Sequence, residues 1–435
     1  MSAGSAPSTP WLLRWQGILG DASEGPLGSR LSLIAGSVLC VLLAAMPFVT
    51  RAGLSLLILA SGLLWLVWSL CLPAGRIGRI SGWLLLMLGI AVLATGFSPV
   101  TPAAFKGLLK LISYLGVYAL LRQLLERAPL WWDRLVASLL GGELLSSVLA
   151  IRQLYGDTSE LARWADPNSV ADGTIRVYGP LENPNLLAGY LIPILPIALI
   201  ALLRWRSWPQ RLFAASALLL GSSALFLSYS RGGWLGMVAA LGAAILLLVL
   251  RQTRHWPPLW RRLFPLLLIA VAVCVLVVAV TQIEPLRIRV MSLAAGRGDS
   301  SNNFRINVWL AAIEMIQERP WLGIGPGNSA FNLIYPLYQQ PGYTALSAYS
   351  VPLELAVETG IPGLLAATGL LFSALRLGLQ QLQRDLVLSL PALGAAAAVI
   401  GLAGHGVVDT IFFRPEVQIS GWFALATLGA ARQLR

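Results

Sequence analysis

The sequence predicts an all-α fold: a polytopic membrane bundle of about twelve transmembrane helices, with a large periplasmic loop that carries short helices. Two observations predict this fold class. Hydrophobic residues fill 57% of the 435 positions and charged residues only 11%, which leaves too little polar surface for a soluble protein. Apolar stretches close to the ~20-residue length that crosses a bilayer also recur along almost the whole chain. The lipid bilayer is therefore the expected surroundings of this protein.

The apolar stretches fall into two groups of expected spans, within residues 31–281 and 351–435. A polar cytoplasmic tail, residues 1–30, precedes the first group, and an outer loop at 155–185 interrupts it. A large periplasmic loop at 282–350 separates the two groups. The expected spans are 31–50, 53–72, 80–97, 105–121, 134–154, 186–203, 211–229, 232–250, 263–281, 351–375, 387–404 and 417–432.

The positive charge of the chain indicates its orientation. The formal net charge is +12, from 31 basic and 19 acidic residues, and the arginines gather in alternate short connections between the spans. Cytoplasmic connections of membrane proteins carry such an excess, so these connections and both termini are expected in the cytoplasm. The basic balance therefore reports on orientation, and we expect no nucleic-acid partner.

The large loop contains a predicted helix over 302–318, capped by Asp299, Ser300 or Ser301. Its apolar stripe either lies flat in the outer membrane interface or packs on the tops of the membrane helices. Pro320 ends this helix, and three glycines follow at alternate positions in 323–327. Such glycines either form a plain turn, which we favour, or expose backbone N–H groups to an anion.

Several cations are expected at one depth, the outer boundary of the membrane. They are Lys106 and Lys110 on the fourth span, Arg176 ahead of the sixth span, and Arg231 in a tight outer connection. An arginine at this depth either extends to the interface or meets an anion. A phosphate or pyrophosphate would explain several of these cations together, helped by helix N-termini such as the one that Asn185 is expected to cap.

Four carboxylates and one histidine are further candidates. Glu143 lies in the middle of a span, where it either moves protons or, as we favour, pairs with Lys110. Glu354 and Glu358 share one helical face, suited to acid–base work or to binding outer arginines. His405 and Asp409 are also four residues apart, a spacing that fits proton transfer or packing. The histidines and cysteines show no metal-ligand spacing, so no metal and no cofactor is predicted.

Taken together, these motifs resemble the O-antigen ligase and polymerase superfamily of bacterial membrane proteins. The similarity spans roughly residues 170–380 and is nearest to the cyanobacterial branch named for inorganic carbon (bicarbonate) transport. The matching residues are Arg176 with Gly179 and 183–185, Ser228-Tyr229-Ser230-Arg231-Gly232, Arg305 with Trp309 and Glu314, Pro320-Trp321-Leu322-Gly323-Ile324-Gly325-Pro326-Gly327, and Leu353-Glu354-Leu355-Ala356-Val357-Glu358-Thr359-Gly360.

The resemblance implies a multi-pass protein of the bacterial inner membrane. The thylakoid membrane is the alternative location. It also implies metal-independent glycan transfer from a polyprenyl pyrophosphate carrier, with Arg176 and Arg231 serving the pyrophosphate. Arg305 is a further candidate for binding the anion. The chain departs from the family where a catalytic histidine is expected, because 347–350 reads Ser-Ala-Tyr-Ser. Enzyme activity therefore stays open, with Tyr349, His405 and the glutamates 354 and 358 as catalytic candidates. Bicarbonate transport, or a non-catalytic role in carbon uptake, is the alternative.

Overall fold

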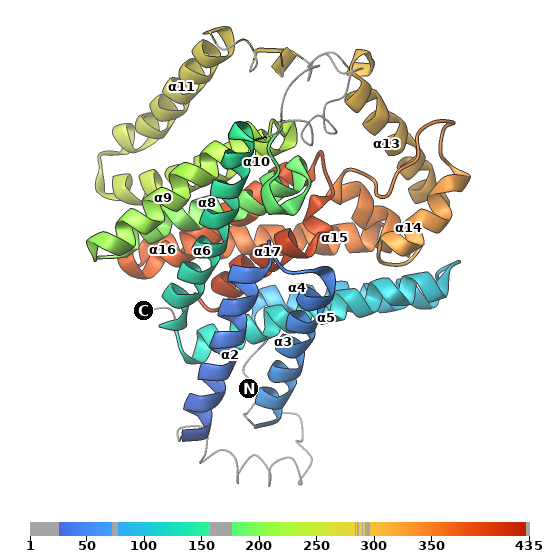
Figure 1. Ribbon diagram of the computed structural model, residues 1–435, viewed down its shortest axis with the longest axis horizontal. Helices are drawn as coiled ribbons and strands as arrows, with labels where there is room; N and C mark the ends of the chain where they lie inside the picture. Colours follow the sequence, from blue (N-terminus) through green and yellow to red (C-terminus); the bar gives the residue numbers. More distant parts are fainter. Residues whose placement is uncertain are drawn as a thin grey trace.

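The computed structural model describes residues 26–71, 77–156, 176–282 and 296–431, together with 284, 287–288 and 290–291. Helices dominate these residues, which contain no strand. The longer helices are α2 (Pro26–Ala45), α3 (Arg51–Cys71), α4 (Arg79–Gly96), α5 (Thr101–Arg127), α6 (Trp131–Arg152), α8 (Pro184–Arg204), α9 (Trp208–Leu227), α10 (Arg231–Gln252), α11 (Pro258–Gln282), α13 (Ser300–Glu318), α14 (Asn328–Ile334), α15 (Val351–Gln380), α16 (Leu386–Gly406) and α17 (Pro415–Gly429) (Figure 1).

Ten of the described helices are long and apolar enough to cross a bilayer, which confirms the predicted all-α membrane bundle. Two of the twelve predicted spans lie outside this group of ten, although both are helical. For 263–281 the structure has α11, which is 25 residues long and stands apart from the bundle at the upper left of Figure 1. For 417–432 it has α17, which at 15 residues is short for a bilayer and lies buried among other helices.

The centre of the bundle is α8, the most deeply buried of the ten helices. It packs against α6, α9, α10, α16 and α17, and side chains such as Leu187, Leu191 and Leu195 are fully buried. The outer helices instead expose large apolar side chains, among them Leu56 on α3 and Leu219 on α9. This distribution fits a bundle whose periphery meets lipid and whose polar groups are gathered inside or at the ends.

Helix α15 is broken near its start, and the glycine-rich loop 323–327 donates hydrogen bonds to the carbonyls that the break leaves without helical partners. Gly360 has φ 70° and ψ −176°, so the helical hydrogen bonds are interrupted there. The carbonyl of Val357 accepts the Ile324 N–H at 2.9 Å, and the carbonyl of Glu358 accepts the Gly325 N–H at 2.9 Å. These two N–H groups are therefore bonded within the protein and are not exposed to an anion. At both positions the loop is the turn that the sequence favoured.

The helix predicted at 302–318 is confirmed as α13, and Asp299 caps it by accepting the Asn302 N–H at 3.1 Å. Its predicted apolar stripe includes Val308, Ala312 and Met315, which are buried. They join a core with the first turn of α5 and the glycine-rich loop. The stripe thus packs on the ends of membrane helices, and the alternative of this side resting on the lipid interface is wrong.

Candidate functional site

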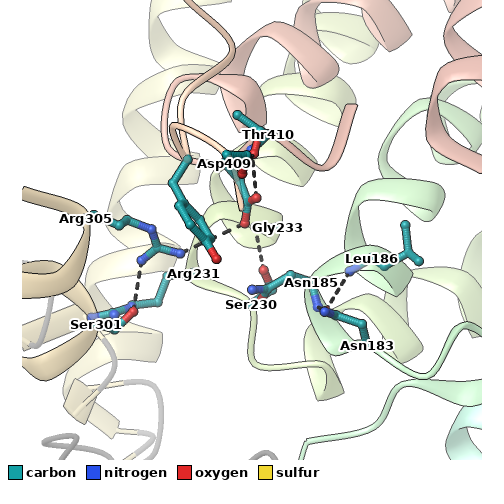
Figure 2. Close-up of polar contacts among 12 residues, drawn as sticks. Asn183, Asn185, Leu186, Ser230, Arg231, Gly233, Ser301, Arg305, Asp409 and Thr410 are labelled. Carbon is teal, nitrogen blue, oxygen red and sulfur yellow. Dashed lines mark hydrogen bonds and ion pairs between the residues drawn. The ribbon is translucent and has the colours of Figure 1, made fainter. Parts of the chain in front are cut away.

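A three-residue connection, Ser228–Ser230, joins α9 to α10 at the centre of the site. The Ser230 hydroxyl caps α10 by accepting the Gly233 N–H at 3.2 Å (Figure 2). Arg231 is the first residue of α10, and its Nη2 lies 3.0 Å from Asp299 Oδ1. The side chains of the two are only 8% and 0% exposed. Arg231 therefore does not extend to the interface, because it is buried against a carboxylate.

Arg176 meets the same connection from the other side. Its Nε donates to the Ser228 carbonyl at 2.9 Å, and its Nη2 donates to Asn185 Oδ1 at 2.7 Å. The cap of α8 was expected at Asn185 but lies two residues earlier. Asn183 caps the helix by accepting the N–H groups of residues 185 and 186 (Figure 2), which leaves the Asn185 side chain to hold Arg176. Arg176 and Arg231 thus adjoin the same short connection.

Arg305 extends the site along α13. Its Nη1 donates to Ser301 Oγ at 3.1 Å, and its Nη2 lies 4.0 Å from Asp409 Oδ2 (Figure 2). Its Nε is buried without a hydrogen-bond partner. Asp409 follows the end of α16 and also accepts the Thr410 N–H at 2.7 Å. Arg305 is therefore held more loosely by its carboxylate than Arg231 is by Asp299.

These five side chains form what we call the arginine cluster: Arg176, Arg231, Arg305, Asp299 and Asp409. Three guanidinium groups face two carboxylates, so positive charge remains. The helices α8, α10 and α13 all begin at the cluster. Helix N-termini carry partial positive charge, which favours bound anions. The sequence indicated the three arginines as candidates but not that these two aspartates are their partners. The rule that a buried cation requires a counter-charge would have indicated that each arginine has an acidic partner.

The two lysines do not complete this cluster. Lys106 and Lys110 are exposed on the first turns of α5, and Lys110 Nζ lies 5.8 Å from the centre of the Tyr114 ring. Its electrostatic neighbours include Glu358. Arg414 and Glu416 are its other electrostatic neighbours, and none of the three belongs to the arginine cluster. Lys110 is therefore placed apart from the three arginines.

Glu354 and Glu358 are engaged with backbone groups. Both are buried, and the Glu354 carboxylate accepts the N–H of Ala348. The Glu358 carboxylate accepts the N–H of Gly327. The pair thereby ties two segments of the large loop to the start of α15, which is a structural use of two carboxylates on one helical face.

Three residues other than glycine have left-handed backbone conformations in the described ranges, and two of them, Tyr229 and Tyr349, adjoin the cluster. The three are Glu182 at φ 58°, Tyr229 at φ 49° and Tyr349 at φ 51°. Such strained residues gather at functional sites. Burial raises the pKa of Tyr349, and the charge of Asp409 adds to the effect. Its phenol therefore stays protonated at neutral pH and is suited to donating a hydrogen bond.

His405 lies on α16, four residues before Asp409, and is 2% exposed. Its Nε2 is buried without a hydrogen-bond partner. The imidazole lies beside Gly232 of α10, the residue that follows Arg231. The structure thus brings His405 next to the cluster from a helix distant in sequence.

Glu143 is buried on α6, and its expected pairing with Lys110 is wrong. Its Oε1 accepts the Ser147 hydroxyl at 2.8 Å, while its Oε2 has no hydrogen-bond partner. Gly221 of α9 lies against the carboxylate, since a Cβ built there would be 2.3 Å from Oε1. Ser147, one turn along the same helix, thus takes the place expected for Lys110, whose electrostatic neighbours do not include Glu143.

The fold and the site together define a polytopic helical membrane protein with a buried, positively charged cluster where several helices end. Residues 215–368 match the family model described as O-antigen ligase. The match begins within α9 and ends within α15, so it contains Arg231, Asp299 and Arg305, whereas Arg176 and His405 lie outside it. This protein is therefore O-antigen ligase-like over that region. No curated protein matches the chain.

Proposed function

We propose that this protein transfers a glycan from a polyprenyl pyrophosphate carrier at the outer face of the bacterial inner membrane, and that the arginine cluster holds the pyrophosphate. The observation that carries the proposal is the short connection Ser228–Ser230, because Arg176 donates to its first carbonyl and Arg231 directly follows it. The match of residues 215–368 to the O-antigen ligase model supports the same chemistry.

The cluster suits a pyrophosphate leaving group. Guanidinium groups donate paired, charge-assisted hydrogen bonds to phosphate oxygens, and each carries five N–H donors in a planar fork. One arginine can therefore hold an aspartate and a phosphate oxygen together. Donors fixed in a buried site stabilise charge that develops in the transition state more strongly than donors in water do. Arg305, with an unpartnered Nε, is the arginine that needs least rearrangement to receive the anion.

The reaction is a substitution at the anomeric carbon of the carrier-linked sugar. An acceptor hydroxyl oxygen forms a bond to that carbon while the bond from carbon to the phosphate oxygen breaks. The electron pair leaves with the polyprenyl pyrophosphate, and the hydroxyl proton passes to a base. Among the described residues, the arginine-rich connections lie at the opposite ends of the helices from the cluster. By the positive-inside rule we therefore expect the cluster outside the cytoplasm and both termini inside it.

The test uses purified protein in liposomes with lipid-linked glycans extracted from cells that make the protein, and it measures release of polyprenyl pyrophosphate. Arg176→Lys and Arg231→Lys keep the charge but lose the fork, and each should lower turnover roughly tenfold or more, since hydrogen bonds to charged groups contribute about 1.5–3 kcal/mol. Arg152→Lys is the matched control, because Arg152 is exposed at the nearby end of α6. Full turnover in both cluster variants would contradict the proposal.

The alternative is bicarbonate transport, or a non-catalytic role in inorganic carbon uptake. The observation that favours bicarbonate transport is the excess positive charge of the arginine cluster, which attracts small anions. The same liposomes decide between the two functions. Uptake of labelled bicarbonate above that of protein-free vesicles, without carrier turnover, would support transport and exclude glycan transfer.

A further inference from the structure

The proposed substitution requires a group that takes the proton of the acceptor hydroxyl, and the carboxylates near the cluster are already engaged. Asp299 binds Arg231 and caps α13. Asp409 accepts the Thr410 N–H and faces Arg305. The glutamates at 354 and 358 accept backbone N–H groups. Each of these groups therefore has a structural task that protonation would weaken.

His405 is in a different position, because its Nε2 is buried and has no hydrogen-bond partner. Buried polar atoms are nearly always hydrogen-bonded, so an exception needs an explanation. A neutral imidazole nitrogen that carries no proton is an acceptor, and it is the side chain best suited to accept a proton near neutral pH. An unpartnered acceptor beside the cluster points to a ligand group that donates a hydrogen bond.

Three glycines shape the slot that holds this imidazole. A Cβ built on Gly189 of α8 would lie 3.4 Å from His405 Cε1, and one on Gly232 of α10 would lie 3.4 Å from Nε2. A Cβ built on Gly236, one turn further along α10, would lie 2.9 Å from the His405 Cβ. Small residues on two helices thus let the ring reach the first turn of α10.

We propose that His405 is the general base of the transfer step, an inference that rests on the proposed function. Its Nε2 accepts the proton of the acceptor hydroxyl as the oxygen bonds to the anomeric carbon and the pyrophosphate leaves toward Arg231. Asp409, four residues along the chain, supplies negative charge that stabilises the imidazolium. The base thus comes from α16, outside the matched region 215–368, and not from the loop ahead of α15.

Access to the buried nitrogen requires a shift of the Ser228–Ser230 connection. Tyr229 in this connection has a left-handed backbone at φ 49°, a conformation that surrounding contacts must impose on a residue other than glycine. In the proposed reaction this connection moves when the pyrophosphate binds Arg231, the residue that follows it. The acceptor hydroxyl then reaches Nε2 beside Gly232.

The test replaces His405 by glutamine, which fills the slot and accepts hydrogen bonds but does not take up a proton. Carrier turnover should fall roughly 100-fold or more, the contribution of a general base, while binding of the extracted polyprenyl pyrophosphate glycans stays as in the wild type. The chain has only two histidines, so His255→Gln is the matched control. His255 is exposed after α10, at the arginine-rich end of the bundle, and this variant should turn over normally.

A second variant distinguishes a base from a packing residue. In His405→Ala, added imidazoles of graded basicity should restore turnover in proportion to their basicity, because they take the proton in place of the side chain. A group that only fills space would restore it independently of basicity.

The possible outcomes distinguish a failure of the role of His405 from a failure of the proposed glycan transfer. Normal turnover in His405→Gln, or loss of carrier binding together with turnover, would overturn the role of His405 alone. Absence of turnover in the wild type would overturn both the proposed transfer and the base.

Discussion

Each arginine of the cluster meets a different kind of partner, and the difference bears on what it can do. Arg176 holds a backbone carbonyl and a side-chain amide, both neutral. Arg231 holds a buried carboxylate at 3.0 Å, whereas Arg305 faces one at 4.0 Å. A buried ion pair adds little net stability, yet removing one partner is strongly destabilising. Asp299 is therefore the residue at which stability and anion affinity should respond in opposite directions.

Asp299→Asn tests that opposition. Asparagine is a good helix cap, so α13 keeps its start, but Arg231 loses its counter-charge. The free energy of unfolding should fall by about 3 kcal/mol, and the affinity for pyrophosphate should rise, because the carboxylate no longer competes. Thermal unfolding in detergent and titration with inorganic pyrophosphate measure the two effects.

The matched control is Asp133→Asn, which removes the partner of Arg204 at 3.1 Å in another part of the bundle. It should leave the pyrophosphate affinity unchanged. Weaker pyrophosphate binding in Asp299→Asn would contradict the competition between aspartate and phosphate.

At this scale the sequence predicted which residues are unusual better than which residues they meet. Arg176 and Arg231 were identified because cations at the membrane boundary require an explanation. Asp299 was recognised as a cap from its local pattern, but its ion pair joins residues 68 positions apart and leaves no local signal. Glu143 shows the opposite case: its partner Ser147 is four residues away on its own helix, but a buried carboxylate was expected to pair with a cation on another span.

At the scale of elements, the break in α15 at Gly360 holds the large loop against the membrane helices, because the loop bonds to the carbonyls that the break exposes. Gly360→Ala tests it, because a Cβ there would lie 2.4 Å from the Trp321 carbonyl carbon and the backbone has φ 70°. The melting temperature should fall, and protease cleavage within 323–350 should become faster as the loop loosens. Gly242→Ala on α10 is the control, since its Cβ would meet no atom within 4 Å. Equal stability of the two variants would show that the break needs no glycine.

Two adjacent glycines of α6 offer a test of helix packing. A Cβ on Gly142 would lie 2.4 Å from the Ala44 carbonyl oxygen of α2, whereas one on Gly141 would meet open space. Alanine favours a helix over glycine by about 1 kcal/mol. Gly141→Ala should therefore leave thermal stability unchanged or raise it, and Gly142→Ala should lower it. The reverse order would mean that α2 does not pack on α6 as described.

Helices were predictable here because length and apolarity alone define a span. What could not be predicted was the fate of marginal segments. The residues 417–432 are apolar enough for a span, yet Pro415 begins a helix that ends at Gly429, and its side chains pack inside the bundle. A side chain buried in protein and one exposed to lipid are equally apolar, so composition does not distinguish them.

At the scale of the whole molecule, the bundle has two unlike ends. One carries the arginine-rich connections, and the other carries the cluster and α13. Cysteine labelling tests the orientation in a background without native cysteines. Leu346→Cys, 66% exposed at the cluster end, should react with a membrane-impermeant thiol reagent in intact cells stripped of any outer membrane. Trp208→Cys, 73% exposed at the arginine-rich end, should react only after permeabilisation. The opposite pattern would invert the topology and put the cluster in the cytoplasm.

The most direct test of the account is the affinity of the purified protein for a water-soluble, short-chain polyprenyl pyrophosphate, measured by equilibrium titration. Arg176→Ala, Arg231→Lys and Arg305→Ala should each weaken binding roughly tenfold or more, while Arg152→Ala, at the same end of the bundle, should bind as the wild type does. The same affinity in all five proteins would contradict the claim that the three arginines converge on one pyrophosphate.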